Sequence, residues 1–79
     1  MTQSEIDNFV RRAEEIYSGR LRAILEPDHL NEFVAIEPES GDYFLCATLS
    51  EASRAAREKY PDRLTHAMRV GHSAALHLG

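Results

Sequence analysis

The stretch that decides the fold runs from residue 33 to residue 63: FVAIEPESGDYFLCATLSEASRAAREKYPDR. At its start, residues 33–37 alternate apolar side chains between two faces, which favours a strand buried on at least one side. Residues 38–42 are turn formers, and Gly41 among them can adopt a positive φ. Residues 43–47 are aromatic and apolar and predict a return strand. Together these segments predict an antiparallel β-hairpin at the centre of the chain.

A capped helix is predicted directly after the hairpin. Thr48 and Glu51 have the spacing of a capping box, in which the hydroxyl and the carboxylate each accept a hydrogen bond from a free amide at the helix start. One face of this helix is formed by Leu49, Ala52, Ala56 and Tyr60. Because alanine side chains are short, we expect the helix to lie close against the sheet, and we expect Pro61 to end it.

An amphipathic helix is predicted over residues 4–25, because apolar residues recur there with nearly the period of an α-helix. Ser4 is the expected N-cap, Gly19 an expected kink or break, and Pro27 the expected end of the helix. The apolar stripe is long for a domain of 79 residues, so we expect part of it to pack against another protein surface. The residues expected at that interface are Ile6, Phe9, Val10, Ala13, Ile16 and Tyr17.

After the second helix, residues 64–70 predict a third strand and residues 73–78 a fourth. Gly71 and His72 either form a two-residue hairpin turn between them or mark a bulge in a single bent strand. The expected fold is therefore a single α+β domain over residues 1–79, in which the amphipathic helix precedes a ββαββ core at residues 33–79. Its element order is α-β-β-α-β-β, with a small and mainly antiparallel sheet.

Composition narrows the class of protein. Hydrophobic residues make up 43% of the chain and charged residues 28%, as in ordinary globular proteins, and the net charge is −4. With nine Lys and Arg residues and no basic run, no contact with nucleic acid is expected. No segment is apolar enough to cross a membrane, and the first residues lack the pattern of a signal peptide. Because Cys46 is the single cysteine, we expect a cytoplasmic protein without a disulfide.

Short motifs are spread over residues 24–79: Glu26-Pro27, Phe33-Val34-Ala35-Ile36, Ser40-Gly41-Asp42-Tyr43-Phe44, Glu51-Ala52, Tyr60-Pro61 and Arg69-Val70-Gly71. In these motifs the chain resembles a group of small bacterial single-domain proteins of unknown function. Some of that group look as though they are encoded beside a partner gene, which implies an accessory or antitoxin-like role. The chain departs from the group at Cys46, where glycine is expected, and at Asn31-Glu32, which replace a glycine-bearing approach to the first strand.

These features favour a non-enzymatic interaction or accessory module, either a homodimer or a subunit that binds another protein. A core of this size leaves roughly 3–5 kcal/mol of net stability, and small domains often gain more from a staple or a partner. The sequence offers no disulfide and no zinc-finger spacing, so association is the expected supplement. The glycines are isolated and the serines lack a nucleophile-elbow context, so no enzyme and no cofactor are predicted.

The alternative is a small metal- or ligand-binding domain that uses His66 and His77. If residues 64–78 form a hairpin, these two histidines are cross-strand neighbours and could share a metal ion. A zinc site needs further ligands, and Cys46 and His72 are the nearest candidates. Because a pattern of two ligands is weak, it favours two histidines on a half-exposed sheet face that bind nothing. Cys46 lies between apolar neighbours and is expected to be structural.

Overall fold

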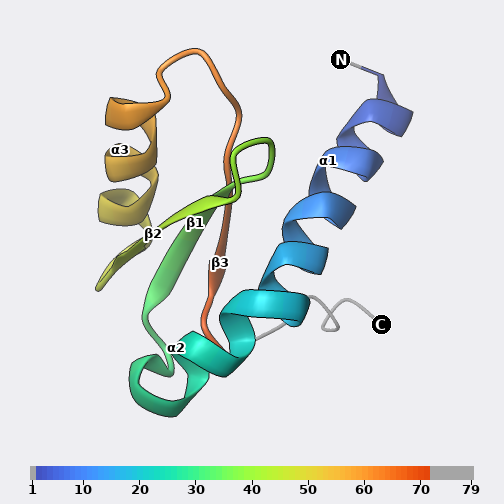
Figure 1. Cartoon of the computed structure of the whole chain (residues 1–79). Coiled ribbons are helices and arrows are strands. Elements are labelled where there is room, and N and C mark those ends of the chain that lie inside the picture. The colour runs from blue at the N-terminus through green and yellow to red at the C-terminus, as the bar shows by residue number, and fades with distance from the viewer. Residues whose placement is uncertain (1, 72–79) are drawn as a thin grey trace.

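The computed structural model describes residues 2–71 and shows an α+β fold, as the sequence predicts. A long N-terminal helical segment is followed by a β-hairpin, then by a separate helix and by a third strand (Figure 1). The elements are α1 (Gln3–Ile16), η1 (Tyr17–Leu21), α2 (Arg22–His29), β1 (Phe33–Glu37), β2 (Asp42–Cys46), α3 (Leu49–Lys59) and β3 (His66–Arg69). The predicted fourth strand, at residues 73–78, lies outside the described residues.

The strands form one antiparallel sheet in the order β2-β1-β3. The predicted hairpin is present, with Glu37 opposite Asp42 across its turn. In that turn the Gly41 N–H donates to the Glu37 carbonyl at 2.9 Å, and Gly41 has a φ of +80°, as expected. The strand order places β1 at the centre of the sheet. The sequence pattern did not specify this order.

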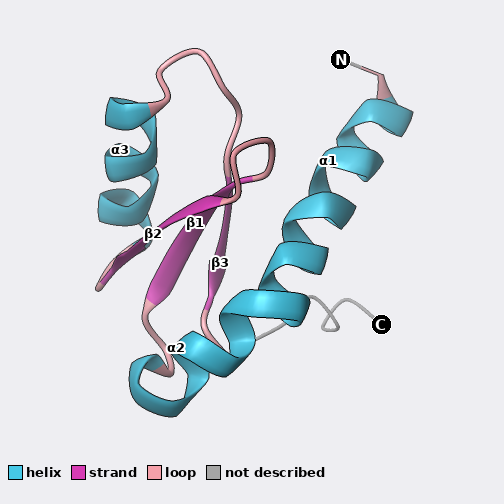
Figure 2. Cartoon of the chain, viewed as in Figure 1, coloured by secondary structure: helices cyan, strands magenta, loops and turns pink. Residues whose placement is uncertain are grey.

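Helices cover both faces of this sheet (Figure 2). On one face, Val34 and Ile36 of β1 pack in a cluster with the N-terminal helical segment. On the other face, Ala35 packs against Ala52 and Ala56 of α3. The predicted alternation of β1 side chains between the two sheet faces is thus confirmed. Both faces of β1 are buried, because a helix lies on each face of the sheet.

The N-terminal segment covers the sheet with four side chains spaced four residues apart: Ala13, Tyr17, Leu21 and Leu25. In a regular α-helix, a spacing of four drifts around the axis, because one turn takes 3.6 residues. Here η1 is a π-helical turn, in which the Arg22 N–H donates to the Tyr17 carbonyl five residues earlier. The wider turn offsets the drift and keeps all four side chains on the sheet. Gly19 lies in this turn, where the sequence predicted a kink or break.

Two predicted boundaries of this segment are wrong. The N-cap is Thr2, not Ser4: the Thr2 hydroxyl accepts from the Glu5 N–H at 3.2 Å, and the Glu5 carboxylate accepts from the Thr2 N–H at 2.8 Å. At the other end, Pro27 does not stop the helix, which continues to His29. Pro27 cannot donate to the carbonyl of Ala23, but Ala23 is exposed, so water can bind that carbonyl instead.

α3 begins at the predicted cap, where the Thr48 hydroxyl accepts from the Glu51 N–H at 3.2 Å. The other half of the predicted capping box differs, because the Glu51 carboxylate accepts from the Thr48 hydroxyl at 3.2 Å. Its buried face is narrower than expected, because Leu49 is 49% exposed while Ala52 and Ala56 are fully buried. Leu49 lies in the first turn, before the helix meets the sheet. Among residues 2–71, no helix is both long enough and apolar enough to span a membrane.

β3 is shorter than predicted and begins at His66 rather than residue 64. Beyond it, the chain is held to the connection between α2 and β1, since the Val70 N–H donates to the Glu32 carbonyl at 2.8 Å and the Asn31 N–H donates to the Val70 carbonyl at 3.0 Å. Gly71 has a φ of +88°, which suits either a turn or a bulge, and its N–H donates to the Tyr17 hydroxyl at 2.9 Å.

Candidate functional site

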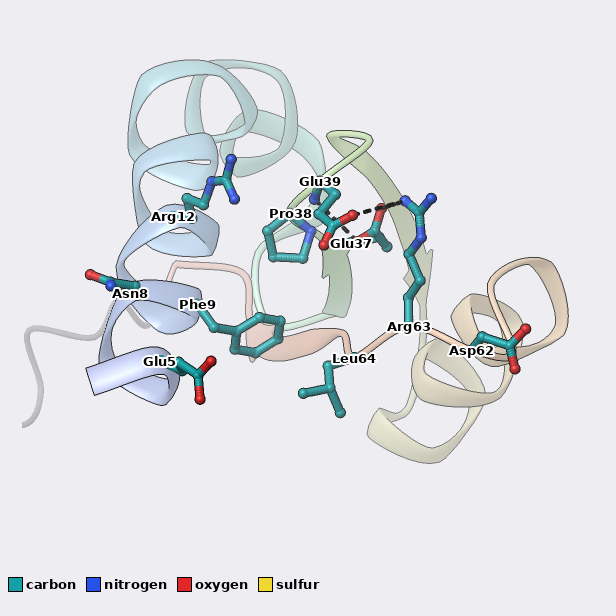
Figure 3. A pocket seen from close by; sticks show the side chains of 10 residues that line it. All are labelled: Glu5, Asn8, Phe9, Arg12, Glu37, Pro38, Glu39, Asp62, Arg63 and Leu64. Carbon is teal, nitrogen blue, oxygen red and sulfur yellow. Dashed lines mark hydrogen bonds and ion pairs between the residues drawn. The ribbon is translucent and has the colours of Figure 1, made fainter. Parts of the chain in front are cut away.

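A groove of about 530 Å³ lies between the first half of α1, the β1–β2 turn and the loop that joins α3 to β3 (Figure 3). We call it the α1 groove. Its apolar side chains come one from each of these segments: Phe9, Pro38 and Leu64. Figure 3 shows the Phe9 ring and the Leu64 side chain next to each other at one end. Pro38 is buried, so the accessible apolar surface of the groove comes from Phe9 and Leu64, which are far apart in the sequence.

Charged and polar side chains surround this apolar surface. Glu5, Asn8 and Arg12 contribute from α1, and Glu39 and Asp62 from the two loops. All of these residues are exposed to solvent. An apolar centre with a charged rim is the usual composition of a surface that binds another protein.

One wall of the groove is fixed by the buried carboxylate of Glu37, which is 1% exposed. It accepts hydrogen bonds from the N–H groups of Glu39 at 3.1 Å and Ser40 at 2.8 Å, and it forms an ion pair with Arg63 at 3.2 Å. Burial raises the pKa of Glu37, but the hydrogen bonds from Ser40, Glu39 and Arg63 outweigh it and hold the pKa below its ordinary value. This carboxylate joins the hairpin turn to the α3–β3 loop.

A second set of contacts holds the end of α3 against β2. The Tyr60 hydroxyl donates to Asp42, and Lys59 forms an ion pair with the same carboxylate at 3.2 Å. The hydrogen bond from Tyr60, followed by the contact with Lys59, lowers the pKa of Asp42. The Arg63 guanidinium lies 5.5 Å from the centre of the Tyr60 ring. The loop that carries Leu64 is therefore attached to both ends of the β1–β2 turn, at Glu37 through Arg63 and at Asp42 through Tyr60.

The predicted interface residues fall into two groups. Ala13 and Tyr17 are 0% and 1% exposed in the core of the chain itself, so the prediction that they meet a partner is wrong. Ile16 is partly buried against the same core. The remaining three, Ile6, Phe9 and Val10, lie on residues 3–12, which we call the projecting half of α1. No residue of this half is buried, and Ile6 is 39% exposed.

Of the histidines in the predicted metal site, the structure describes only His66. His66 lies on β3 opposite Ile36, with its ring edge-on to Phe9 at 6.4 Å between centroids. Burial lowers the pKa of His66, against the smaller opposing effect of Glu14. His77 and His72 lie outside the described residues, so the pairing of His66 with His77 and the role of His72 as a further ligand stay predictions. Within residues 2–71, no three His, Cys, Asp or Glu side chains are grouped so that they could hold a metal ion.

Sequence reasoning missed Leu64 as a site residue, because it assigned Leu64 to the third strand. The structure places it in the loop before β3, where it is 55% exposed. Its position just after the turn formers Pro61 and Asp62 was the available signal. Cys46 is half-buried beside the Ala35 cluster, as its apolar neighbours indicated.

Comparisons with protein-family models, with curated proteins and with solved structures found no match for this chain.

Proposed function

We propose that this chain is a non-enzymatic protein-interaction module, and that the α1 groove is the surface that receives its partner. The observation that carries this proposal is an exposed apolar surface at the groove, where Leu64 is 55% exposed and Phe9 lines the same groove. Burial of the exposed part of the Leu64 side chain removes apolar surface from water and so stabilises a complex. The charged rim, with Glu5 and Arg12 on α1, supplies orientation and specificity to such an interface.

The proposal extends to the setting of this module. Its single cysteine, half-buried and without a disulfide, suits the reducing conditions of the cytoplasm. The groove is built on a hairpin turn and a loop that are both anchored by Glu37, so its shape exists before the partner binds. A preformed groove on a small domain fits an accessory subunit whose role is defined by the protein it binds.

Leu64→Asp is expected to weaken partner binding at least tenfold, because the substitution places a charge in the apolar part of the groove. The measurement is a pull-down of the tagged full-length chain from the lysate of its source cells, read by mass spectrometry and followed by light scattering of the eluate. We expect the wild-type chain to recover one stoichiometric partner or to elute as a defined homo-oligomer.

The matched control is Leu49→Asp, which changes a side chain of similar exposure (49%) on α3, away from the groove. It should bind as the wild-type chain does. A wild-type chain that elutes without a partner and stays monomeric even when concentrated, or equal losses in both variants, would refute the groove as the interaction surface. Point variants are preferable to removal of residues 1–25, because that segment includes the core residues Ala13 and Tyr17.

A further inference from the structure

We infer that the partner of the projecting half of α1 is a second copy of this chain, paired antiparallel to it about a two-fold axis beside Asn8 and Phe9. This inference rests on the proposed function, because it names the occupant of the same surface. It is carried by the order of charges along that surface, which is complementary to itself.

Glu5, Phe9 and Arg12 lie on one face of α1, because residues separated by three, four or seven positions share a face of an α-helix. All three line the α1 groove, and Glu5 and Arg12 are exposed. The face therefore carries a negative charge on one side of Phe9 and a positive charge on the other. Figure 3 shows Glu5 and Arg12 along the helix on either side of Phe9.

An antiparallel pair of these faces brings Glu5 of one copy to the partner's Arg12, and Arg12 to the partner's Glu5. The two Phe9 side chains, each edge-on to His66 of its own chain, then lie near the axis, where their remaining exposed apolar surface becomes buried. A two-fold interface requires a patch that complements itself in this way. A parallel pair would instead place each charge against its like, which is unfavourable. The charge order thus selects the antiparallel arrangement.

The size of the surface determines how tightly the copies bind. α1 has 14 residues and is about 21 Å long, at a rise of about 1.5 Å per residue. One face of residues 3–12, with Leu64 beside it, is a small contact surface compared with the roughly 1,200 Å² or more that stable complexes bury. We therefore expect a weak dimer that dissociates on dilution.

Charge reversal in the full-length chain tests this pairing, with the dissociation constant measured by sedimentation over a range of concentrations. Glu5→Arg and Arg12→Glu each create two like-charged contacts per dimer and should each raise the constant about tenfold or more. An equal mixture of the two single variants restores opposite charges across the interface. The mixture and the double variant E5R/R12E should both dimerise within about threefold of the wild-type constant.

Two controls separate charge from other effects. Glu5→Gln keeps an acceptor for the Thr2 N–H and so preserves the helix cap, while it removes the charge. Arg57→Glu reverses an exposed charge on α3 and should leave the dimer unchanged. Thermal unfolding of each variant checks that the fold is intact.

The outcomes distinguish this inference from the proposed function. A wild-type chain that stays monomeric, or a dimer that resists charge reversal at Glu5 and Arg12, would overturn the second copy as occupant. In either case, loss of a different protein partner by Leu64→Asp would still uphold the groove as an interaction surface. A dimer that resists both the charge reversals and Leu64→Asp would overturn both.

Discussion

Tyr17→Ala is expected to lower the free energy of unfolding by about 3–5 kcal/mol, the usual effect of removing a large buried side chain. Tyr17 is 1% exposed and lies at the centre of the cluster that joins the N-terminal segment to β1. A loss of this size is comparable with the whole stability of so small a domain. The variant should therefore be largely unfolded at 25 °C by circular dichroism.

Tyr17→Phe isolates the hydroxyl from the ring. The hydroxyl accepts from the Gly71 N–H at 2.9 Å and donates to the Glu26 carboxylate at 2.8 Å. Its removal leaves the Gly71 N–H without this acceptor, and we expect a loss of about 1–3 kcal/mol in urea unfolding. Tyr43→Phe, at a hydroxyl on a residue that is 38% exposed, should change stability by less than about 0.5 kcal/mol. Equal effects of the two substitutions would contradict this role of Tyr17.

Glu37→Gln is expected to lower the free energy of unfolding by about 1.5–3 kcal/mol. The buried carboxylate accepts two backbone N–H bonds and the Arg63 contact, and hydrogen bonds to a charged group contribute about that much. Glu39→Gln is the matched control, because the Glu39 carboxylate also lies near Arg63, at 3.6 Å, but is 67% exposed. The control should cost less than about 0.5 kcal/mol in the same urea titration.

The same substitution has a pH signature. Because the pKa of Glu37 is lower in the folded chain than in the unfolded chain, ionised Glu37 stabilises the fold fully above its unfolded pKa. That contribution is lost as the pH falls through the lower folded pKa. The stability difference between wild type and Glu37→Gln should therefore be constant near neutral pH and shrink in acid. A difference that grows as the pH falls below 4 would show that the folded pKa is not lowered.

Local signals in the sequence were sufficient for the hairpin and for α3. Gly41 and the turn formers around it fix a tight reversal, and Thr48 satisfies a free amide at a helix start, so neighbouring residues alone decide both features. The same signal misplaced the first N-cap. Ser4 and Thr2 are both good caps, but only Thr2 has Glu5 three positions later, which completes the capping box.

Features that depend on distant residues were not predictable from the local pattern. The π-helical turn at Tyr17–Leu21 arises because the segment must keep contact with the sheet over several turns. The sequence pattern shows the apolar stripe but not the sheet face that covers its second half. For this reason Ala13 and Tyr17 were assigned to a partner, although the chain's own sheet buries them.

The candidate site was predicted in part. Of the interface residues predicted from periodicity, Phe9 lines the α1 groove, whereas Ile6 and Val10 lie on the projecting half of α1 and are not among the residues that line the groove. Leu64 and Pro38 could not be joined to it, because the groove brings together three segments separated in the sequence. Only the tertiary fold brings these three segments together around the groove.

Hydrogen exchange of the backbone amides tests the central claim most directly, namely that a second copy covers the projecting half of α1. The full-length chain is compared at concentrations well above and well below its dissociation constant. At high concentration, we expect slower exchange at residues 3–12 and 62–64, and unchanged exchange in α3. Exchange at residues 3–12 that does not depend on concentration, or protection that appears in α3 instead, would contradict the claim.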